Sequence, residues 1–148
     1  MIYPLFATLK EFIITQPAMV SLDIADKLYQ FHIIPMNDVR KELGVWVTAS
    51  QQSGHRPQWY EVDKGRSGNS QHTFKEDWIK GSGAVDWTCK DFKENRDRFL
   101  NLIIQNTNYT RICVYDTFLH CDYKDTVNGK REIFRYDGLK WQFTMNVR

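Results

Sequence analysis

Three residues of this sequence could together hold a metal ion: His72, Asp86 and His120. Asp86 stands between Val85 and Trp87, and a carboxylate in an apolar segment needs a cation or a metal to compensate its charge. Two imidazole nitrogens and one carboxylate oxygen, with a fourth position left for water, form a usual ligand set of catalytic zinc. Bound zinc lowers the pKa of water and polarises a carbonyl oxygen, so this set predicts metal-assisted hydrolysis.

The segment around His120 has the alternation of a β-strand. A period of two places His120 and Asp122 on one face of the strand, and Leu119 and Cys121 on the other. A histidine and an aspartate that point together off a sheet favour a site over a core. A lone histidine is more often a surface or hydrogen-bonded side chain, so the prediction depends on the convergence of all three residues.

The order of these motifs resembles that of the zinc D-Ala-D-Ala carboxypeptidases and L-alanyl-D-glutamate endopeptidases, which share the hedgehog/DD-peptidase fold. The family motif S-x-H-x-x-G-x-A-x-D is similar to Ser70, His72 and the run Gly83-Ala84-Val85-Asp86. The late family strand with its second histidine is similar to the segment 118–122. The upstream S-G-Y-R-S motif has its counterpart in the segment 53–57, which reads S-G-H-R-P. The resemblance thus covers residues 36 to 123, roughly.

The resemblance implies an α+β fold in which N-terminal helices pack on a C-terminal antiparallel sheet. It implies that a zinc ion is held by His72, Asp86 and His120, and that Arg56 binds a substrate carboxylate or steadies the oxyanion. The fixed fork of a guanidinium suits either role. The implied substrate is the peptide stem of bacterial peptidoglycan, in which a carboxypeptidase or endopeptidase, such as a phage endolysin, hydrolyses an amide bond.

The first departure from the family pattern lies between two of the implied ligands. The family spaces its first histidine and its aspartate seven residues apart, whereas His72 and Asp86 are 14 apart (86 − 72). An inserted surface loop costs little free energy, so the site can survive it. The insertion raises Asp77 as a rival ligand. We favour Asp86, because its Ala-x-Asp-aromatic context matches and its apolar neighbours demand a partner.

The second departure concerns the general base. The family base is often a Glu or Asp three residues before the last histidine, and position 117 is Thr here. Asp116 is our first choice, because a loop carboxylate can reach a catalytic water. Asp122 is the other candidate, and it could instead orient His120 as a ligand. If neither serves, the domain is a weak or inactive relative that acts as a cell-wall-binding or virion structural module.

Further substrate contacts are expected from a polar stretch, residues 50–83, because long polar segments inside compact domains are often functional. Trp59 and Trp78 lie in this stretch and could line a substrate groove, or pack beneath a loop. His55, beside Arg56, and Ser70 of the motif are also expected to face the substrate.

Two helices and a strand are predicted before this polar stretch. Ser21 is the expected N-cap of the first helix, because its hydroxyl can accept a free backbone N–H. The apolar face of this helix is expected to comprise Leu22, Ala25, Leu28 and Tyr29. The second helix is expected over Asn37–Leu43, with Asn37 as its cap and Gly44 as its stop. The β-rich run Val45–Thr48 predicts a strand.

After the polar stretch, the pattern predicts one helix and then a sheet. Thr88 and Asp91 resemble a capping box, and an amphipathic helix follows to about Gln105. Its apolar stripe is Phe92, Phe99, Leu100 and Ile103. Strand composition occurs at Arg111–Tyr115, Phe118–Tyr123, Glu132–Tyr136 and Leu139–Phe143. Asn128-Gly129 and Asp137-Gly138 are tight-turn sequences. Helices first and strands last indicate an α+β arrangement.

Composition limits the remaining possibilities. The chain of 148 residues has 42% hydrophobic and 26% charged residues, which predicts one globular domain over 1–148. A net charge of +2 argues against a nucleic-acid-binding role, and no apolar run is long enough to span a membrane. The N-terminus lacks a secretory signal pattern and the three cysteines cannot all pair, so we expect a protein made in the cytoplasm. We also expect a monomer. Such an enzyme would reach the cell wall through phage lysis or as a virion component; the alternative is a bacterial cytoplasmic enzyme that acts on recycled peptides.

Overall fold

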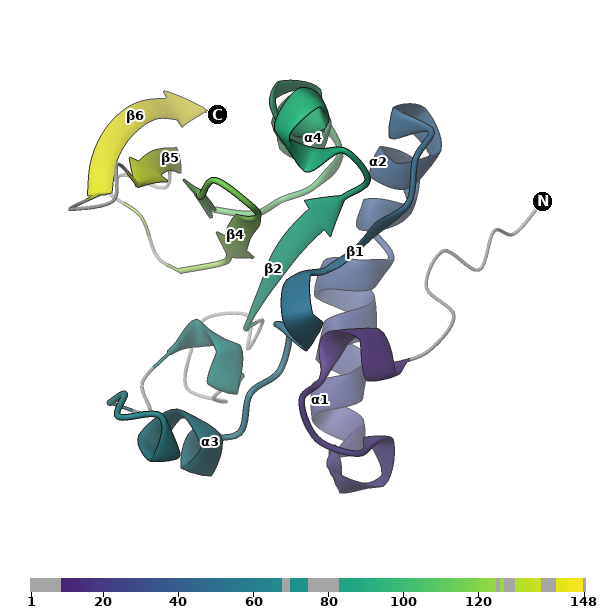
Figure 1. The fold of residues 1–148 in the computed structure, drawn as a ribbon, viewed down its shortest axis with the longest axis vertical. Coiled ribbons are helices and arrows are strands. Elements are labelled where there is room, and N and C mark those ends of the chain that lie inside the picture. Colours follow the sequence, from purple (N-terminus) through teal and green to yellow (C-terminus); the bar gives the residue numbers. More distant parts are fainter. Residues whose placement is uncertain are drawn as a thin grey trace.

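The computed structural model describes residues 9–67, 70–74, 83–124, 126, 130–136 and 141–147, the last strand and Tyr136 in their backbone alone. The predicted tight turns at 128–129 and 137–138 lie outside the described residues. Helices occupy the first part of the chain and strands the last, which confirms the α+β class (Figure 1). None of the described helices is both long and apolar enough to cross a membrane.

The first helices begin and end close to where local chemistry predicts. Helix α1 (Leu22–Lys27) starts at Ser21, whose Oγ accepts the Ile24 N–H at 3.2 Å, as predicted. The chain continues as a π-helix, η3 (Leu28–Ile33), so the predicted apolar face does not persist: Leu28 is buried, but Tyr29 is exposed. Leu22 is 90% exposed in the first turn.

Helix α2 (Met36–Leu43) begins one residue before the predicted start and follows Pro35, so Asn37 is not its cap. It ends at Gly44, which takes the left-handed conformation (φ +77°) expected of a stop glycine. Strand β1 (Val47–Ala49) follows, slightly later than predicted. The 3-10 helices η1 (Leu9–Phe12), η2 (Pro17–Met19), η4 (Ser50–Gln52) and η5 (Gln71–Thr73) and the short helix α3 (Gln58–Asp63) complete this half.

The longest helix, α4 (Phe92–Asn106), carries the predicted buried stripe of Phe92, Phe99, Leu100 and Ile103. The predicted capping box is wrong. Asp91 precedes the helix in a left-handed conformation (φ +50°) without a side-chain cap bond. Thr88 belongs to strand β2 (Ala84–Cys89), where its hydroxyl donates to the Thr117 carbonyl at 3.0 Å. Pairing of this strand therefore holds Thr88 in extended backbone, too early to cap.

Within the described residues, the sheet has six strands in the order β1-β2-β4-β3-β5-β6 and is mixed, not antiparallel as predicted. Its later strands are β3 (Arg111–Val114), β4 (Leu119–Asp122), β5 (Arg131–Tyr136) and β6 (Trp141–Val147). The parallel pair is β3 with β5. Strand β2 already occupies the free edge of β4. The chain after the β3–β4 hairpin must therefore pair with the other edge of β3, in the same direction.

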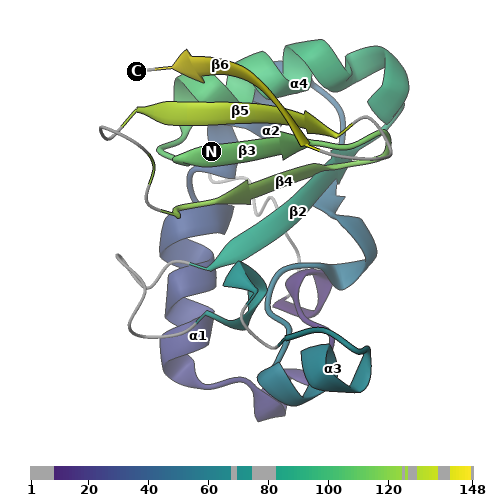
Figure 2. The ribbon, with the colours of Figure 1, turned by 90° about the vertical axis from the view of Figure 1, so that its left-hand side faces the viewer.

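Helices α2 and α4 pack together and lie behind the sheet in Figure 2. The core between them and the sheet includes Val85, Trp87 and Leu119, which alternate along their strands with Asp86 and His120. Successive side chains of a strand point to opposite faces. Asp86 and His120 therefore lie on the sheet face that α2 and α4 do not cover.

Candidate metal centre

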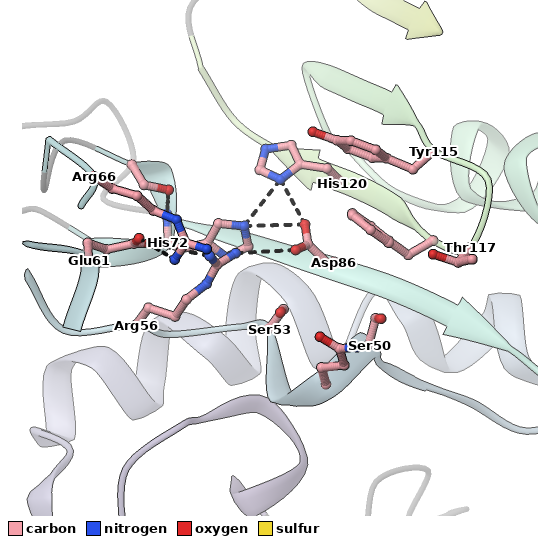
Figure 3. Close-up of a pocket in the computed structure, with 13 residues that line it drawn as sticks. Ser50, Ser53, Arg56, Glu61, Arg66, His72, Asp86, Tyr115, Thr117 and His120 are labelled. Atoms are coloured by element: carbon pink, nitrogen blue, oxygen red, sulfur yellow. Dashed lines mark hydrogen bonds and ion pairs between the residues drawn. The ribbon is translucent and has the colours of Figure 1, made fainter. Parts of the chain in front are cut away.

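The structure brings His72, Asp86 and His120 together as one group that could hold a metal ion. His72 Nε2 lies 3.2 Å from His120 Nδ1 and 3.2 Å from Asp86 Oδ1, and the last two atoms lie 2.8 Å apart (Figure 3). Tetrahedral zinc with bonds of ~2.0 Å places its ligand atoms about 3.3 Å apart. The triangle is therefore close to the size that such an ion requires.

Strand pairing places two members of this triad. Asp86 of β2 stands directly opposite His120 of β4 in the antiparallel register, and both are on the uncovered face. The third member comes from a distant segment, since His72 lies on η5. Ser70 caps this short helix by accepting the His72 N–H at 3.2 Å, and Arg56 N–H donates to the His72 carbonyl at 2.8 Å.

The second ring nitrogen of each histidine is held by a separate acceptor. His72 Nδ1 donates to the Gly54 carbonyl at 2.8 Å, and His120 Nε2 donates to Asp122 Oδ2 at 2.7 Å. A carbonyl has no proton to give, so His72 Nδ1 carries its ring proton and Nε2 is left with a lone pair. Such contacts fix the tautomer and the ring orientation of metal-binding histidines.

Asp122 is itself held on several sides and is fully buried. Arg111, across the β3–β4 pair, donates to Asp122 Oδ2 through Nε at 2.9 Å and through a second guanidinium nitrogen. Asp122 Oδ1 accepts the Lys124 N–H at 2.9 Å. With both oxygens engaged, Asp122 is positioned to orient His120.

Burial and neighbouring charges shift the pKa values of the three triad residues by different amounts. Burial lowers the pKa of His72, which outweighs the attraction of Asp86. Burial also opposes a charge on His120, but hydrogen bonds to Asp122 and Asp86 raise its pKa to about 9. Burial alone would raise the pKa of Asp86, yet the two histidines hold it well below its usual range. Without metal, a proton on His120 Nδ1 therefore binds the triad together.

The triad opens into a pocket of about 420 Å³. The pocket is lined by Ser50, Gln51, Ser53, Arg56, Glu61, Arg66, Ser70, His72, Asp86, Tyr115, Thr117, Phe118 and His120. Arg56 bridges two carboxylates in its wall: one guanidinium nitrogen lies 3.3 Å from Asp86 Oδ2 and the other 3.4 Å from Glu61 Oε1. Asp86 thus offers one oxygen to the triad and the other to Arg56.

No protein-family model, curated protein or solved structure matches this chain. The chemistry open to the site is accordingly that of its own residues in their arrangement.

Of the other predicted site residues, some line the pocket and others do not. Ser70 and Arg56 line the pocket, as expected of substrate-facing residues. Asp116 is exposed in the turn before β4 and does not line the pocket, although its neighbours Tyr115 and Thr117 do. Asp122 lies on the far ring nitrogen of His120 and not on the pocket side.

Of the remaining predicted contacts, the described residues His55 and Trp59 do not line the pocket. His55 is buried and packs edge-on against Phe74, with a parallel bridge to Ile13. Trp59 is 55% exposed on α3 and contacts Tyr60. Trp78 and the rival ligand Asp77 lie outside the described residues. Packing of the residue 53–56 segment against η1 directs His55 to the core, because His55 N–H donates to the Phe12 carbonyl at 2.9 Å.

Sequence reasoning missed Gly54, Glu61, Arg66 and Arg111. Arg111 could have been found, because antiparallel pairing of the two predicted strands places it opposite Asp122. Gly54 stood within the motif but contributes only a backbone carbonyl. Glu61 and Arg66 have no spacing that separates them from ordinary surface charges, and only the placement of α3 brings them to the pocket.

Proposed function

We propose that this domain holds a zinc ion through His72, Asp86 and His120 and hydrolyses an amide bond in the peptide stem of bacterial peptidoglycan, with a fold of the hedgehog/DD-peptidase type. One observation carries the proposal: two imidazole nitrogens and one carboxylate oxygen, 2.8–3.2 Å apart, meet in the wall of an open pocket. Their order along the chain is similar to that of the zinc peptidases named above.

The donor set fits zinc. Imidazole nitrogens with one carboxylate suit this ion, and three protein ligands leave a position open on the pocket side. The second contacts of both rings, to Gly54 and to Asp122, match the supporting shell that metal-binding histidines need. When bound, zinc supplies Lewis-acid stabilisation of the charge that develops on a carbonyl oxygen.

The chain's own residues accept the proton from the attacking water and hold the reacting groups in position. In the reaction, water adds its oxygen to the amide carbon, the C–N bond breaks, and the water proton ends on the amine that leaves. Asp116 is our proposed proton acceptor, from the turn whose neighbours Tyr115 and Thr117 line the pocket. Arg56 holds the carboxylates of Asp86 and Glu61 in position through ion pairs, and Asp122 orients the ring of His120.

A second function is favoured by one further observation. Among the described residues that line the pocket, the carboxylates are Asp86 and Glu61, and both are paired with arginines. A domain without a positioned base would bind zinc and the stem peptide but turn it over slowly or not at all. It would then serve as a cell-wall-binding or virion structural module.

The test combines metal content with cleavage of defined stem peptides. We expect about one zinc per chain by mass spectrometry in the wild type, loss of that zinc in His120→Ala, and hydrolysis that a chelator abolishes and zinc restores. Zinc with peptide binding but no cleavage would support the module. Absence of zinc from the wild type after reconstitution, or unchanged cleavage by His120→Ala, would contradict both.

A further inference from the structure

A buried carboxylate organises the pocket wall beside the triad. Glu61 of α3 is fully buried, and it faces two arginines: Arg56 at 3.4 Å from Oε1 and Arg66 at 2.8 Å from Oε2. A buried charge is tolerated when it is paired in this way. The backbone supports the arrangement, because Arg66 N–H donates to the Glu61 carbonyl at 2.9 Å.

The two arginines differ in what they can still bind. The Arg56 side chain is 14% exposed, and the two terminal nitrogens of its guanidinium face Glu61 and Asp86. The Arg66 side chain is 50% exposed, and its contact with Glu61 runs through one terminal nitrogen. A guanidinium carries five N–H donors in a fixed fork. The Nε of Arg56 has no partner but is buried, so Arg66 is the arginine of this wall whose remaining donors are accessible to a ligand.

The charge of the pocket favours an anion. Arg56 and Arg66 balance Glu61 and Asp86. A divalent ion between neutral histidines would leave two positive charges uncompensated, in a concave site where fields are concentrated. A carboxylate matches the guanidinium fork and would bind Arg66 by charge-assisted hydrogen bonds.

The opposite wall has a different chemistry. Tyr115 and Phe118 stack with ring centroids 4.3 Å apart and planes 22° apart, and both line the pocket. Figure 3 places Glu61 and Arg66 on one side of the triad and Tyr115 on the other. A peptide whose scissile amide bond lies at the triad would thus extend toward a cationic wall on one side of that bond and toward an aromatic wall on the other.

We propose that Arg66 is a specificity-determining residue that binds a free carboxylate on the residue released from the substrate, with Glu61 as the positioning residue that holds it. The proposal rests on the proposed function. The resemblance implies that Arg56 contacts a substrate carboxylate, and the proposal assigns that contact to Arg66 instead. Two substrates carry this chemistry: a peptide with a C-terminal α-carboxylate, and an internal D-glutamyl residue with its α-carboxylate free.

The experiment compares each acid with its amide. The first pair is a stem pentapeptide ending in D-Ala-D-Ala and its C-terminal amide. The second is a peptide with an L-Ala-D-Glu bond and its D-isoglutamine form. Charge-assisted hydrogen bonds contribute roughly 1.5–3 kcal/mol, so the zinc-loaded wild type should prefer one acid over its amide by about 10- to 100-fold in kcat/KM. The pair that shows this preference identifies the source of the carboxylate.

The variants then assign the preference to Arg66. In Arg66→Gln, kcat/KM for the acid should fall to within about threefold of kcat/KM for the amide, and zinc content should equal that of the wild type. Arg66→Lys should recover part of the preference. The control is Arg135→Gln, a 43% exposed arginine of β5 outside the pocket lining, which should keep the full preference.

The outcomes separate this proposal from the proposed function. Equal losses on acid and amide in Arg66→Gln, or no acid preference in the wild type, would overturn the role of Arg66. If the zinc-loaded wild type cleaves neither pair, the proposed hydrolysis fails. Calorimetric binding of the same peptides then decides on Arg66: an acid preference that Arg66→Gln removes supports it, and equal binding of acid and amide rejects it.

Discussion

At the scale of single residues, the candidate centre separates the roles of two aspartates that sequence alone left open. Asp122 contacts the outer nitrogen of His120 and is held by Arg111, so it can orient a ligand but does not reach the pocket. Asp116 lies in an exposed turn between two pocket-lining residues. Removing the charge of each aspartate should therefore affect a different property: zinc affinity for Asp122 and the rate of hydrolysis for Asp116.

Asp122→Asn removes the anionic acceptor of His120 Nε2, so we expect zinc affinity to weaken by about 10- to 100-fold. Asp116→Asn should leave zinc affinity unchanged and lower kcat by about 10²- to 10⁴-fold if Asp116 is the base. Competition with a chromophoric chelator gives the affinities, and peptide cleavage gives kcat. Unchanged zinc affinity in Asp122→Asn would remove its supporting role.

Zinc binding should depend on pH through His120. The metal-free triad holds a proton on His120, whose pKa is about 9, while His72, with its lowered pKa, and Asp86 are already in their metal-binding forms. A metal must displace this one proton, so affinity should rise about tenfold per pH unit from pH 7 and level off near 9. Calorimetry in buffers of different ionisation enthalpy should register about one proton released. An affinity independent of pH would contradict this protonation state.

At the scale of elements, a short loop connects the N-terminal helices to the site. The Gly54 carbonyl orients His72, and the Ser53 carbonyl accepts the Asp86 N–H at 2.7 Å. The same loop abuts η1, since a Cβ on Gly54 would stand 2.3 Å from the Phe12 carbonyl oxygen. The position of this loop thus depends on glycine, and the placement of His72 and Asp86 depends on the loop.

Gly54→Ala should therefore lower the free energy of unfolding by about 2–4 kcal/mol and weaken zinc binding, because backbone must move to relieve the clash. Gly65→Ala is the matched control. Gly65 has a positive φ (+77°) but nothing within 4 Å of the added Cβ, so its cost is limited to about 1–2 kcal/mol of backbone strain. Urea unfolding and zinc titration measure both effects. Equal losses of unfolding free energy and of zinc affinity in the two variants would show that the close approach of Gly54 to Phe12 does not control the position of the loop.

At the scale of the whole molecule, the site is assembled from segments that are far apart in the chain and meet on one side of the sheet. Helices α2 and α4 cover the other face. His55 is buried against Phe74 and the η1 segment and does not line the pocket. Burial, with a smaller effect of His72, lowers its pKa to about 4. Its burial as a neutral ring makes the stability of the fold sensitive to acid.

In the unfolded chain, His55 takes up a proton below about pH 6.5, whereas the folded protein resists protonation down to about pH 4. The stability that neutral His55 allows is therefore present above pH 6.5 and is lost as the pH falls toward 4. Between pH 7.5 and 4.5, metal-free wild type should lose about 2.5 kcal/mol more than His55→Gln. Parallel pH profiles for the two proteins, by urea unfolding, would contradict this account.

The sequence by itself determined the features that local chemistry controls. The Ser21 cap, the Gly44 stop and the stripe of α4 depend on contacts within a few residues, and the alternation around His120 placed it beside Asp122. The residue types and order of the candidate metal-binding triad could also be predicted, because an aspartate in an apolar strand requires a partner.

Only the tertiary structure decided which groups meet across the fold. The parallel β3–β5 pair follows from β2 occupying the edge of β4, and that choice depends on packing of the whole sheet. The Arg56–Glu61–Arg66 wall exists because α3 lies against the pocket, and His55 points inward because its loop pairs with η1. These contacts join residues whose spacing carries no periodic or capping pattern, so their physical cause is the packing of elements and not local preference.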